Sequence, residues 1–305
     1  MAPTMVVPAG PHKAAASPLR GLLYGLAAPI CFSVGGMVMR QVDATGWDMV
    51  FWRSFGHGAT LLPLLWLWHG GARLAGGIRK AGWIGLASTT LLAAASVFHI
   101  LSMASTGVAN TLVLQSTSPF MAASLAWLIL GERVGRLTWA AIAFALTGIA
   151  PILLESPGRG NFSGDLLALG VAAFSAINVI LIRWRPGIDL LPAAGFGGLA
   201  AAAIALTIGA PFAIPSGDAA ALFALGAFQN TLGFTCFVLA LRHLPAADVT
   251  LLALLETVLG SAWVWIFLGE APSGPVLAGG IAVLASVTAI VLGQRRGSRL
   301  NPPIL

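Results

Sequence analysis

The chain of 305 residues is 58% hydrophobic and only 9% charged, and its mean hydropathy is +0.91. Soluble domains are about one-quarter charged, so this composition excludes an ordinary water-soluble protein. The net charge of +6 comes without a contiguous basic face, so the isoelectric point near 10.6 does not indicate a nucleic-acid partner.

The predicted elements are a short tail followed by ten apolar runs. Residues 1–18 are rich in Pro and Ala, have no hydrophobic periodicity and are expected to form a disordered tail. Each run approaches the ~20 residues that a helix needs to cross a bilayer. The runs are 19–39, 47–68, 83–104, 107–130, 137–154, 164–184, 190–211, 219–241, 246–269 and 275–293.

These runs predict an all-α membrane protein with ten transmembrane helices, surrounded by the lipid bilayer. The connections are too short for a soluble domain, and residues 294–305 are expected to form a second tail. The run after Arg20 is too long for the core of a signal peptide and is interpreted as a retained first helix. A monomer is the expected working form, although a dimer stays open.

Charge placement predicts the orientation of these helices. If ten helices alternate, most of the 16 Lys and Arg side chains fall on one side, while Arg40 and Arg159 lie on the other and Arg53 lies within the second run. Positive charge collects on the cytoplasmic side of membrane proteins. Both ends of the chain are therefore expected in the cytoplasm of a bacterial cell, with the helices in its inner membrane. The basic side chains on this predicted cytoplasmic side are Lys13, Arg20, Arg73, Arg79, Lys80, Arg133, Arg136, Arg183, Arg185, Arg242, Arg295, Arg296 and Arg299.

One phrase occurs twice in the sequence. It reads AWLILGE at 126–132 and VWIFLGE at 264–270, so Glu132 and Glu270 end equivalent copies. The stretch LYGLAAPICFS at 23–33 also resembles LLALGVAAFSA at 166–176. Five helices separate the copies of the phrase, and an odd number of crossings inverts the second copy. We therefore predict two inverted five-helix repeats, 19–155 and 164–293, an arrangement that many secondary transporters use to open one central site alternately to both sides.

Residues 105–149 and 244–286, which surround the two LGE triplets, resemble the helix–LGE–helix signature of the drug/metabolite transporter superfamily, EamA type. The resemblance covers residues 19–293. One difference from the family is Glu256-Thr257, where many members have Glu-Pro; the equivalent Ser118-Pro119 keeps the proline. The resemblance implies an exporter of small metabolites, with amino-acid exporters of the YddG kind as the nearest subfamily and aromatic or hydrophobic amino acids among the substrates.

Polar residues inside the runs predict where the substrate binds, because such residues tend to face the bundle interior. Thr111, Gln115 and Ser118 share one helical face, and the offset that relates Glu132 to Glu270 also relates Ser118 to Glu256. The candidate substrate-binding residues are His99, Gln115, Ser118, Asn178, Gln229, Asn230, Glu256 and Trp263. Trp263 is expected to line an outer vestibule.

Each candidate has a structural alternative. Glu256 is the only acid deep in a run, and a structural hydrogen bond competes with a substrate or ion role. His99 could line a cavity, carry a proton or simply pack. A purely structural role, in which the side chain only joins helices by hydrogen bonds worth about 0.6 kcal/mol each, is the alternative for Gln115, Asn178, Gln229 and Asn230. Asp48 and Arg53 are expected near the outer end of their helix, where they could reach lipid headgroups.

Other functions are less well supported by the sequence. An intramembrane enzyme would need a metal set or a carboxylate pair, and the chain has neither an HExxH motif nor a second deep carboxylate. Cys31 and Cys236 have no metal-ligand spacing, so no metal or cofactor is expected. A channel would show a repeated filter. A flippase for a lipid-linked substrate would share this architecture and stays open as the alternative.

Overall fold

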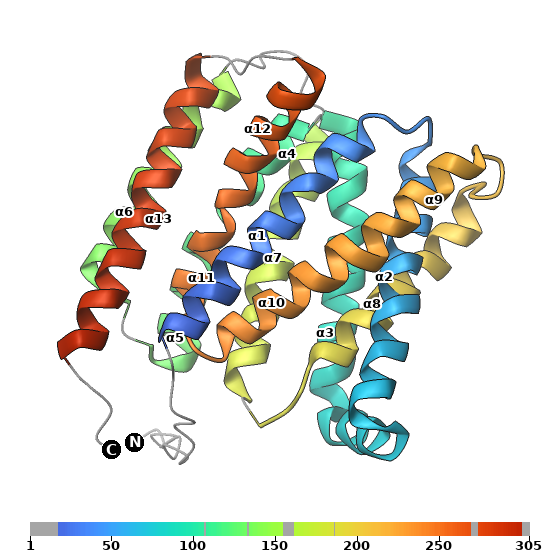
Figure 1. The fold of residues 1–305 in the computed structure, drawn as a ribbon, viewed down its shortest axis with the longest axis horizontal. Coiled ribbons are helices and arrows are strands. Elements are labelled where there is room, and N and C mark those ends of the chain that lie inside the picture. Colours follow the sequence, from blue (N-terminus) through green and yellow to red (C-terminus); the bar gives the residue numbers. More distant parts are fainter. Residues whose placement is uncertain are drawn as a thin grey trace, which may run out of the picture.

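The computed structural model describes residues 18–106, 108–132, 134–154, 162–185, 187–269 and 274–300, which are helical apart from short connections and contain no strand. The all-α fold class is confirmed (Figure 1). The helices are α1 (Pro18–Met39), α2 (Gly46–His69), α3 (Gly71–Thr106), α4 (Val108–Gln115), α5 (Ser118–Leu130), α6 (Arg136–Leu154), α7 (Phe162–Trp184), α8 (Leu191–Ile208), α9 (Ser216–Ala224), the π-helix η1 (Leu225–Asn230), α10 (Thr231–Leu241), α11 (Ala246–Ala253), α12 (Leu255–Leu268) and α13 (Gly274–Leu300).

Three of the predicted runs are divided in the structure. The run 107–130 forms α4 and α5, the run 246–269 forms α11 and α12, and the run 219–241 passes through the π-helical turn η1 between α9 and α10. By length and apolar composition, six helices or continuous helical segments of the described chain can cross a membrane. The count of ten membrane-spanning helices therefore stays a prediction.

Two segments expected to be connections or tails are helical. Residues 71–81 form the first segment of α3, which is joined to the rest of the helix across a kink at Gly82. Gly82 is not helical (φ 48°, ψ −130°), and glycine adopts this conformation without a Cβ penalty. α13 continues to Leu300, so 294–300 are helical where a tail was expected. Residues 1–17 of the predicted tail 1–18 lie outside the described residues, and Pro18 begins α1. Arg133, Arg159 and Glu270 also lie outside the described residues.

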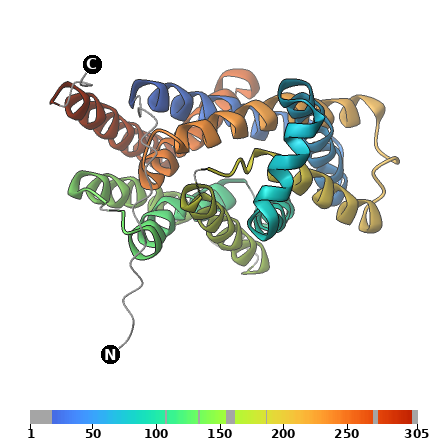
Figure 2. The ribbon, with the colours of Figure 1, turned by 90° about the horizontal axis from the view of Figure 1, so that it is seen from below.

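The packing of the helices repeats between the two halves of the chain. In the predicted repeats, α10 is the equivalent of α3, α12 of α5 and α1 of α7. α3 packs on α7, and α10 packs on α1. Likewise α5 packs on α7, and α12 packs on α1. α2 pairs with α8 and α6 pairs with α13, so these contacts join equivalent helices from the two halves. The pair α6 and α13 forms one side of the molecule in both ribbon views (Figures 1 and 2).

Small residues bring α2 into backbone contact with its neighbours. A Cβ atom added at Gly226 of η1 would overlap the carbonyl oxygen of Arg53, and one added at Gly56 would overlap the carbonyl oxygen of Phe223. A Cβ atom at Gly58 would lie 2.6 Å from the carbonyl oxygen of Gly195 in α8. In a bilayer, where apolar burial does not drive helices together, such close van der Waals packing is a main source of association. α2 therefore packs tightly against α8, α9 and η1.

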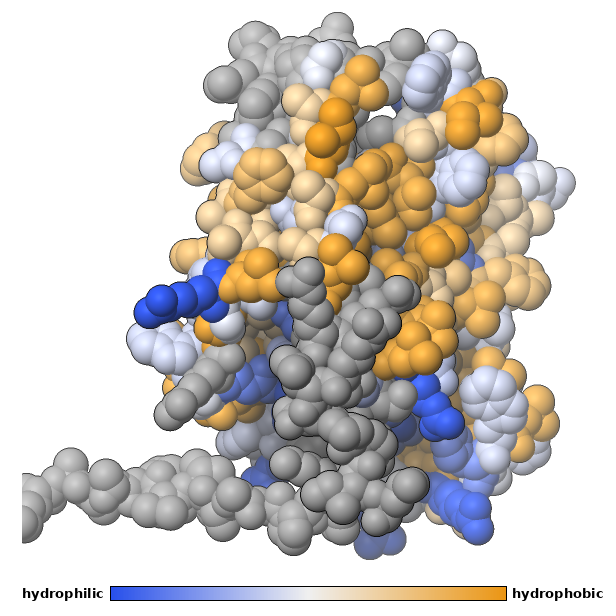
Figure 3. All heavy atoms as spheres, turned by 60° about the vertical axis from the view of Figure 1, so that its left-hand side comes forward, coloured by the Kyte–Doolittle hydropathy of each residue, from blue (hydrophilic) through white to orange (hydrophobic). Residues whose placement is uncertain are grey.

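The outer surface of the helices is strongly apolar. Large side chains such as Leu67, Leu128 and Ile281 are 70%, 68% and 68% exposed. On the side formed by α6 and α13, hydrophobic residues cover most of the described surface and hydrophilic ones collect toward its lower end (Figure 3). A surface of this size and character suits hydrocarbon and not water. The chain is therefore an integral membrane protein.

Candidate functional site

A cavity of about 290 Å³ lies where helices from both halves meet. Its walls come from α1, α2, α3, α4 and α5 of the first half, and from α7, α8, η1, α10, α11 and α12 of the second. The described residues of α6 and α13 contribute nothing to it. The cavity is therefore shared between the two halves, while the α6–α13 pair lies outside it.

Two helix breaks line this cavity at equivalent positions. The first lies at Ser116 and Thr117, between α4 and α5, and the second at Leu254, between α11 and α12. Ser116 and Leu254 are related by the same offset as the two copies of the repeated phrase. The backbone turns tightly at both breaks: Thr117 N–H donates to Leu114 O at 3.2 Å, and Leu254 N–H donates to Leu251 O at 3.1 Å.

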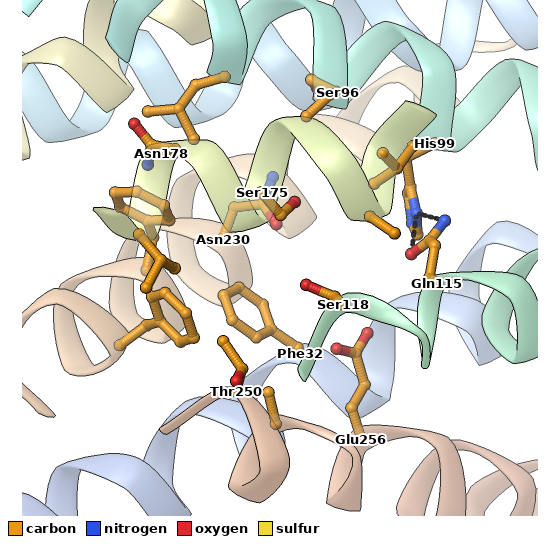
Figure 4. A pocket seen from close by; sticks show the side chains of 18 of the residues that line it. Phe32, Ser96, His99, Gln115, Ser118, Ser175, Asn178, Asn230, Thr250 and Glu256 are labelled. Carbon is orange, nitrogen blue, oxygen red and sulfur yellow. Dashed lines mark hydrogen bonds between the residues drawn. The ribbon is translucent and has the colours of Figure 1, made fainter. Parts of the chain in front are cut away.

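The two breaks have different sequence origins. Pro119 lies in the first turn of α5, has no N–H and disfavours a helix continuing from the residues before it. The equivalent position in the second half is Thr257, so that break forms without a proline. A break places residues just beyond it, here Ser118 and Glu256, at the start of a new helix facing the cavity. Glu256 extends from α12 toward the space beside Ser118 (Figure 4).

Six of the eight predicted site residues line the cavity: His99, Gln115, Ser118, Asn178, Asn230 and Glu256. Some of them also join helices. His99 Nδ1 lies 3.1 Å from Oε1 and 2.9 Å from Nε2 of Gln115, which links α3 to α4. Asn178 Oδ1 accepts a hydrogen bond of 2.6 Å from Ser88 Oγ, which links α7 to α3. A role in substrate binding stays a prediction for all six.

The other two predicted residues do not line the cavity but contact α1. Gln229 Nε2 donates to the carbonyl oxygen of Phe32 at 2.7 Å, and Trp263 Nε1 donates to Ser33 Oγ at 2.8 Å. Both side chains therefore fasten α1 to helices of the second half. Gln229 and Asn230 are neighbours in sequence, yet only Asn230 reaches the cavity.

Arg53 and Asp48 are buried, so the expectation that they reach lipid headgroups is wrong. Asp48 is 3% exposed and forms a capping box with Thr45 at the start of α2. Its carboxylate also accepts a hydrogen bond of 3.0 Å from Ala210 N–H. Arg53 is 8% exposed and lines the cavity, where its Nη2 donates to Asn230 Oδ1 at 2.9 Å. Its Nε is buried and has no acceptor among the described residues.

His57 is another cavity residue that the sequence interpretation left without a role. It lies one helical turn beyond Arg53 on α2, and its Nδ1 lies 3.1 Å from Thr231 Oγ1. The i, i+4 spacing of Arg53 and His57 puts both on one helical face, and both are polar groups inside an apolar run. That pattern could have identified α2 as a wall of the site.

The fold and the site together define a class of protein. A helical membrane protein with a central cavity of polar and charged side chains, shared between two similarly packed halves, is a transporter of small solutes. Among the described residues, no three His, Cys, Asp or Glu side chains come close enough together to hold a metal ion.

Comparison with known proteins gives the family. The model of the EamA-like transporter family matches residues 19–154 and again residues 162–292. The chain therefore belongs to the EamA-like transporter family, within the drug/metabolite transporter superfamily, and it is not an enzyme. The two matched segments lie close to the two predicted repeats.

Three curated relatives are transporters by name. A riboflavin transporter of Rhizobium johnstonii is 29% identical over 227 residues, which cover 71% of this chain and 72% of the relative. The human solute carrier family 35 member G1 is 23% identical over 307 residues, covering 90% and 79%. The pseudopaline exporter CntI of Pseudomonas aeruginosa is 24% identical over 276 residues, covering 88% and 95%. A solved crystal structure has the same fold, with a TM-score of 0.77, 18% identity and coverage of 92% of this chain and 99% of the other.

Proposed function

We propose that this protein exports amino acids, including aromatic and hydrophobic ones, across a bacterial inner membrane. The observation that carries the proposal is the makeup of the shared cavity. It combines charged groups of both signs, Arg53 and Glu256, with apolar rings such as Phe32 and Phe234. An amino acid with an apolar side chain needs both kinds of surface, because its backbone end is charged and its side chain is not.

The proposed mechanism is alternating access between two inverted halves. The repeated packing pairs support it, since exchanging the halves reproduces the contacts of α3 with α7 and of α5 with α7. The two separate family matches and the equivalent breaks at Ser116 and Leu254 also support it. Broken helices at the centre of a bundle are typical hinges and binding elements of such transporters.

The test is counterflow in liposomes that contain the purified protein. The vesicles are loaded with one unlabelled compound, and entry of the same labelled compound is followed over time. The panel contains phenylalanine, leucine, glutamate and lysine, and also riboflavin, because a relative is named for it. Saturable entry of phenylalanine and leucine is expected.

Entry of riboflavin without entry of any amino acid would overturn the proposed substrate while leaving the protein a transporter. Protein-free vesicles give the background. A second control is vesicles loaded with no compound, in which counterflow has no internal partner and the transient peak of label should disappear.

A further inference from the structure

Arg53 is an incompletely satisfied cation at the centre of the protein. The residue is only 8% exposed, and Asn230 satisfies only its Nη2. Nε lies buried without an acceptor among the described residues. A guanidinium group carries five donors in a planar fork and is costly to bury without an anion. The donors that remain suit a carboxylate, which accepts two parallel hydrogen bonds from this fork.

The opposite charge faces the same cavity from the other half of the chain. Glu256 extends from α12, whereas Arg53 extends from α2, and both side chains line the cavity. No ion pair joins them in the described part of the structure, although ion pairs form elsewhere between Arg183 and Glu132 and between Arg242 and Asp189. Two side chains of opposite charge that line one cavity without forming an ion pair leave space for a molecule that bridges them.

We infer that Arg53 binds the carboxylate of the substrate and Glu256 binds its ammonium group, while Asn230 positions the guanidinium of Arg53. The cavity then selects compounds that carry both charges at once, and a compound with only one of them leaves the other protein charge unpaired. This inference rests on the proposed function and adds to it the residues that recognise each end of an amino acid.

The alternative is a purely structural pair, in which Arg53 and Glu256 only balance each other's charge. A structural role makes removal of either residue weaken every ligand by the same factor. If the two residues bind the substrate, removal of Arg53 abolishes the preference for a carboxylate and leaves the preference for an ammonium group. Removal of Glu256 has the reverse effect. Three ligands that share a side chain separate these cases: phenylalanine, phenylalaninamide without the carboxylate, and 3-phenylpropanoate without the ammonium group.

The experiment measures competition by these three compounds against labelled phenylalanine bound to purified protein in detergent. For the wild type, phenylalanine should compete at least about tenfold better than either analogue, because each analogue leaves one charge of the cavity unpaired. In Arg53→Gln, phenylalanine should lose affinity and phenylalaninamide should become its equal. In Glu256→Gln, 3-phenylpropanoate should become the equal of phenylalanine. Asn230→Ala should weaken phenylalanine more than phenylalaninamide.

Two further variants are controls that separate a loss of binding from a loss of folding. Arg242→Gln removes an arginine of a partly exposed ion pair outside the cavity lining and should bind all three ligands like the wild type. Arg53→Lys keeps the positive charge and should keep the preference for a carboxylate at lower affinity. Thermal melting shows whether each variant is folded.

Three outcomes would overturn the inference. An equal loss for all three ligands in folded Arg53→Gln would make Arg53 structural, and the same pattern in Glu256→Gln would make Glu256 structural. Equal binding of the three ligands by the wild type would show that the protein recognises neither the carboxylate nor the ammonium group of the ligand. Absence of phenylalanine binding by the wild type would instead overturn the proposed amino-acid substrate.

Discussion

Arg183 forms an ion pair with Glu132, which ties the end of α7 to the turn that follows α5. The same guanidinium donates from Nη1 to the carbonyl oxygens of Leu241, the last residue of α10, and of Leu244, in the turn that follows, each at 2.7 Å. One side chain thus joins the ends of α5, α7 and α10. Helix ends leave carbonyl groups without intrahelical partners, and Arg183 satisfies that of Leu241.

We predict that Arg183→Gln lowers the stability of the protein more than Arg242→Gln does. Loss of Arg183 leaves partly buried acceptors unpaired, at about 1–3 kcal/mol, whereas exposed ion pairs contribute about 0–1 kcal/mol. Arg242 pairs with Asp189, and both side chains are more exposed than those of Arg183 and Glu132. Thermal unfolding in detergent measures the difference. Equal melting temperatures for the two variants would show that Arg183 contributes no more than an ordinary surface arginine.

The orientation of the helices is testable with reporter tags. Tags at residue 75 and after residue 305 should report the cytoplasm, and a tag at residue 159 should report the opposite side. The reason is the distribution of basic side chains, most of which fall on one predicted side against Arg40 and Arg159 on the other. A C-terminal tag found outside the cell would refute the count of ten membrane-spanning helices.

Cysteines introduced into the cavity should react with a small water-soluble thiol reagent. The positions are Gln115, Ser118 and Asn178, all of which line the cavity, in a background that carries Cys31→Ser and Cys236→Ser. Added substrate should slow the reaction, because it occupies the same space. Leu128→Cys, on the apolar outer surface, is the matched control and should stay unreactive. If Ser118→Cys reacts no faster than this control, the cavity is not open to water.

We predict that transport is facilitative and is not driven by protons. Among the described residues that line the cavity, Glu256 is the only acid, and His57 and His99 are hydrogen-bonded to Thr231 and Gln115 instead of to a carboxylate. Wild-type liposomes should therefore equilibrate labelled phenylalanine without accumulating it when a pH gradient is imposed. Glu256→Gln should weaken the affinity for phenylalanine and leave this insensitivity unchanged. Accumulation driven by pH alone in the wild type, and lost in Glu256→Gln, would establish coupling instead.

The contact between η1 and α2 predicts a large effect for a single methyl group. Gly226→Ala places a Cβ atom on the carbonyl oxygen of Arg53, so the two helices must separate, at about 1–3 kcal/mol. The control is Gly76→Ala in α3, where an added Cβ meets nothing within 4 Å. Thermal unfolding in detergent should show a lower melting temperature for Gly226→Ala and an unchanged or slightly higher one for Gly76→Ala. The same substitution at Gly226 should weaken phenylalanine binding, since it displaces the backbone at Arg53.

The sequence predicted the helical runs well because apolar length is a direct consequence of bilayer thickness. It also predicted that Ser118 and Glu256 lie on the same cavity, because the offset between the repeated phrases relates them. The division of α4 from α5 had a visible cause in Pro119, whereas the break at Leu254 has none in its own half. The repeat was the only signal that pointed to it.

The direction of single side chains was harder to predict. In a membrane bundle the outer face is as apolar as the packed face, so hydrophobicity does not show which way a helix is turned. The position of Arg53 near one end of its apolar run predicts a place close to the lipid headgroups, whereas its side chain turns inward to Asn230. Successive residues of a helix with 3.6 residues per turn point about 100° apart, so Gln229 contacts α1 while its neighbour Asn230 meets the cavity.

The position equivalent to Glu256 is occupied by Ser118, so the two halves of the cavity wall are alike in backbone but different in charge. A substrate that binds as proposed between Arg53 and Glu256 accordingly has one end-to-end orientation, with its carboxylate toward α2 and its ammonium group toward α12. The charges of such a cavity lack two-fold symmetry even though the surrounding helices are arranged as similar pairs. Mirror-image amino acids that bind both charges place their side chains against different walls, so the proposed binding mode predicts that the transporter distinguishes L from D enantiomers.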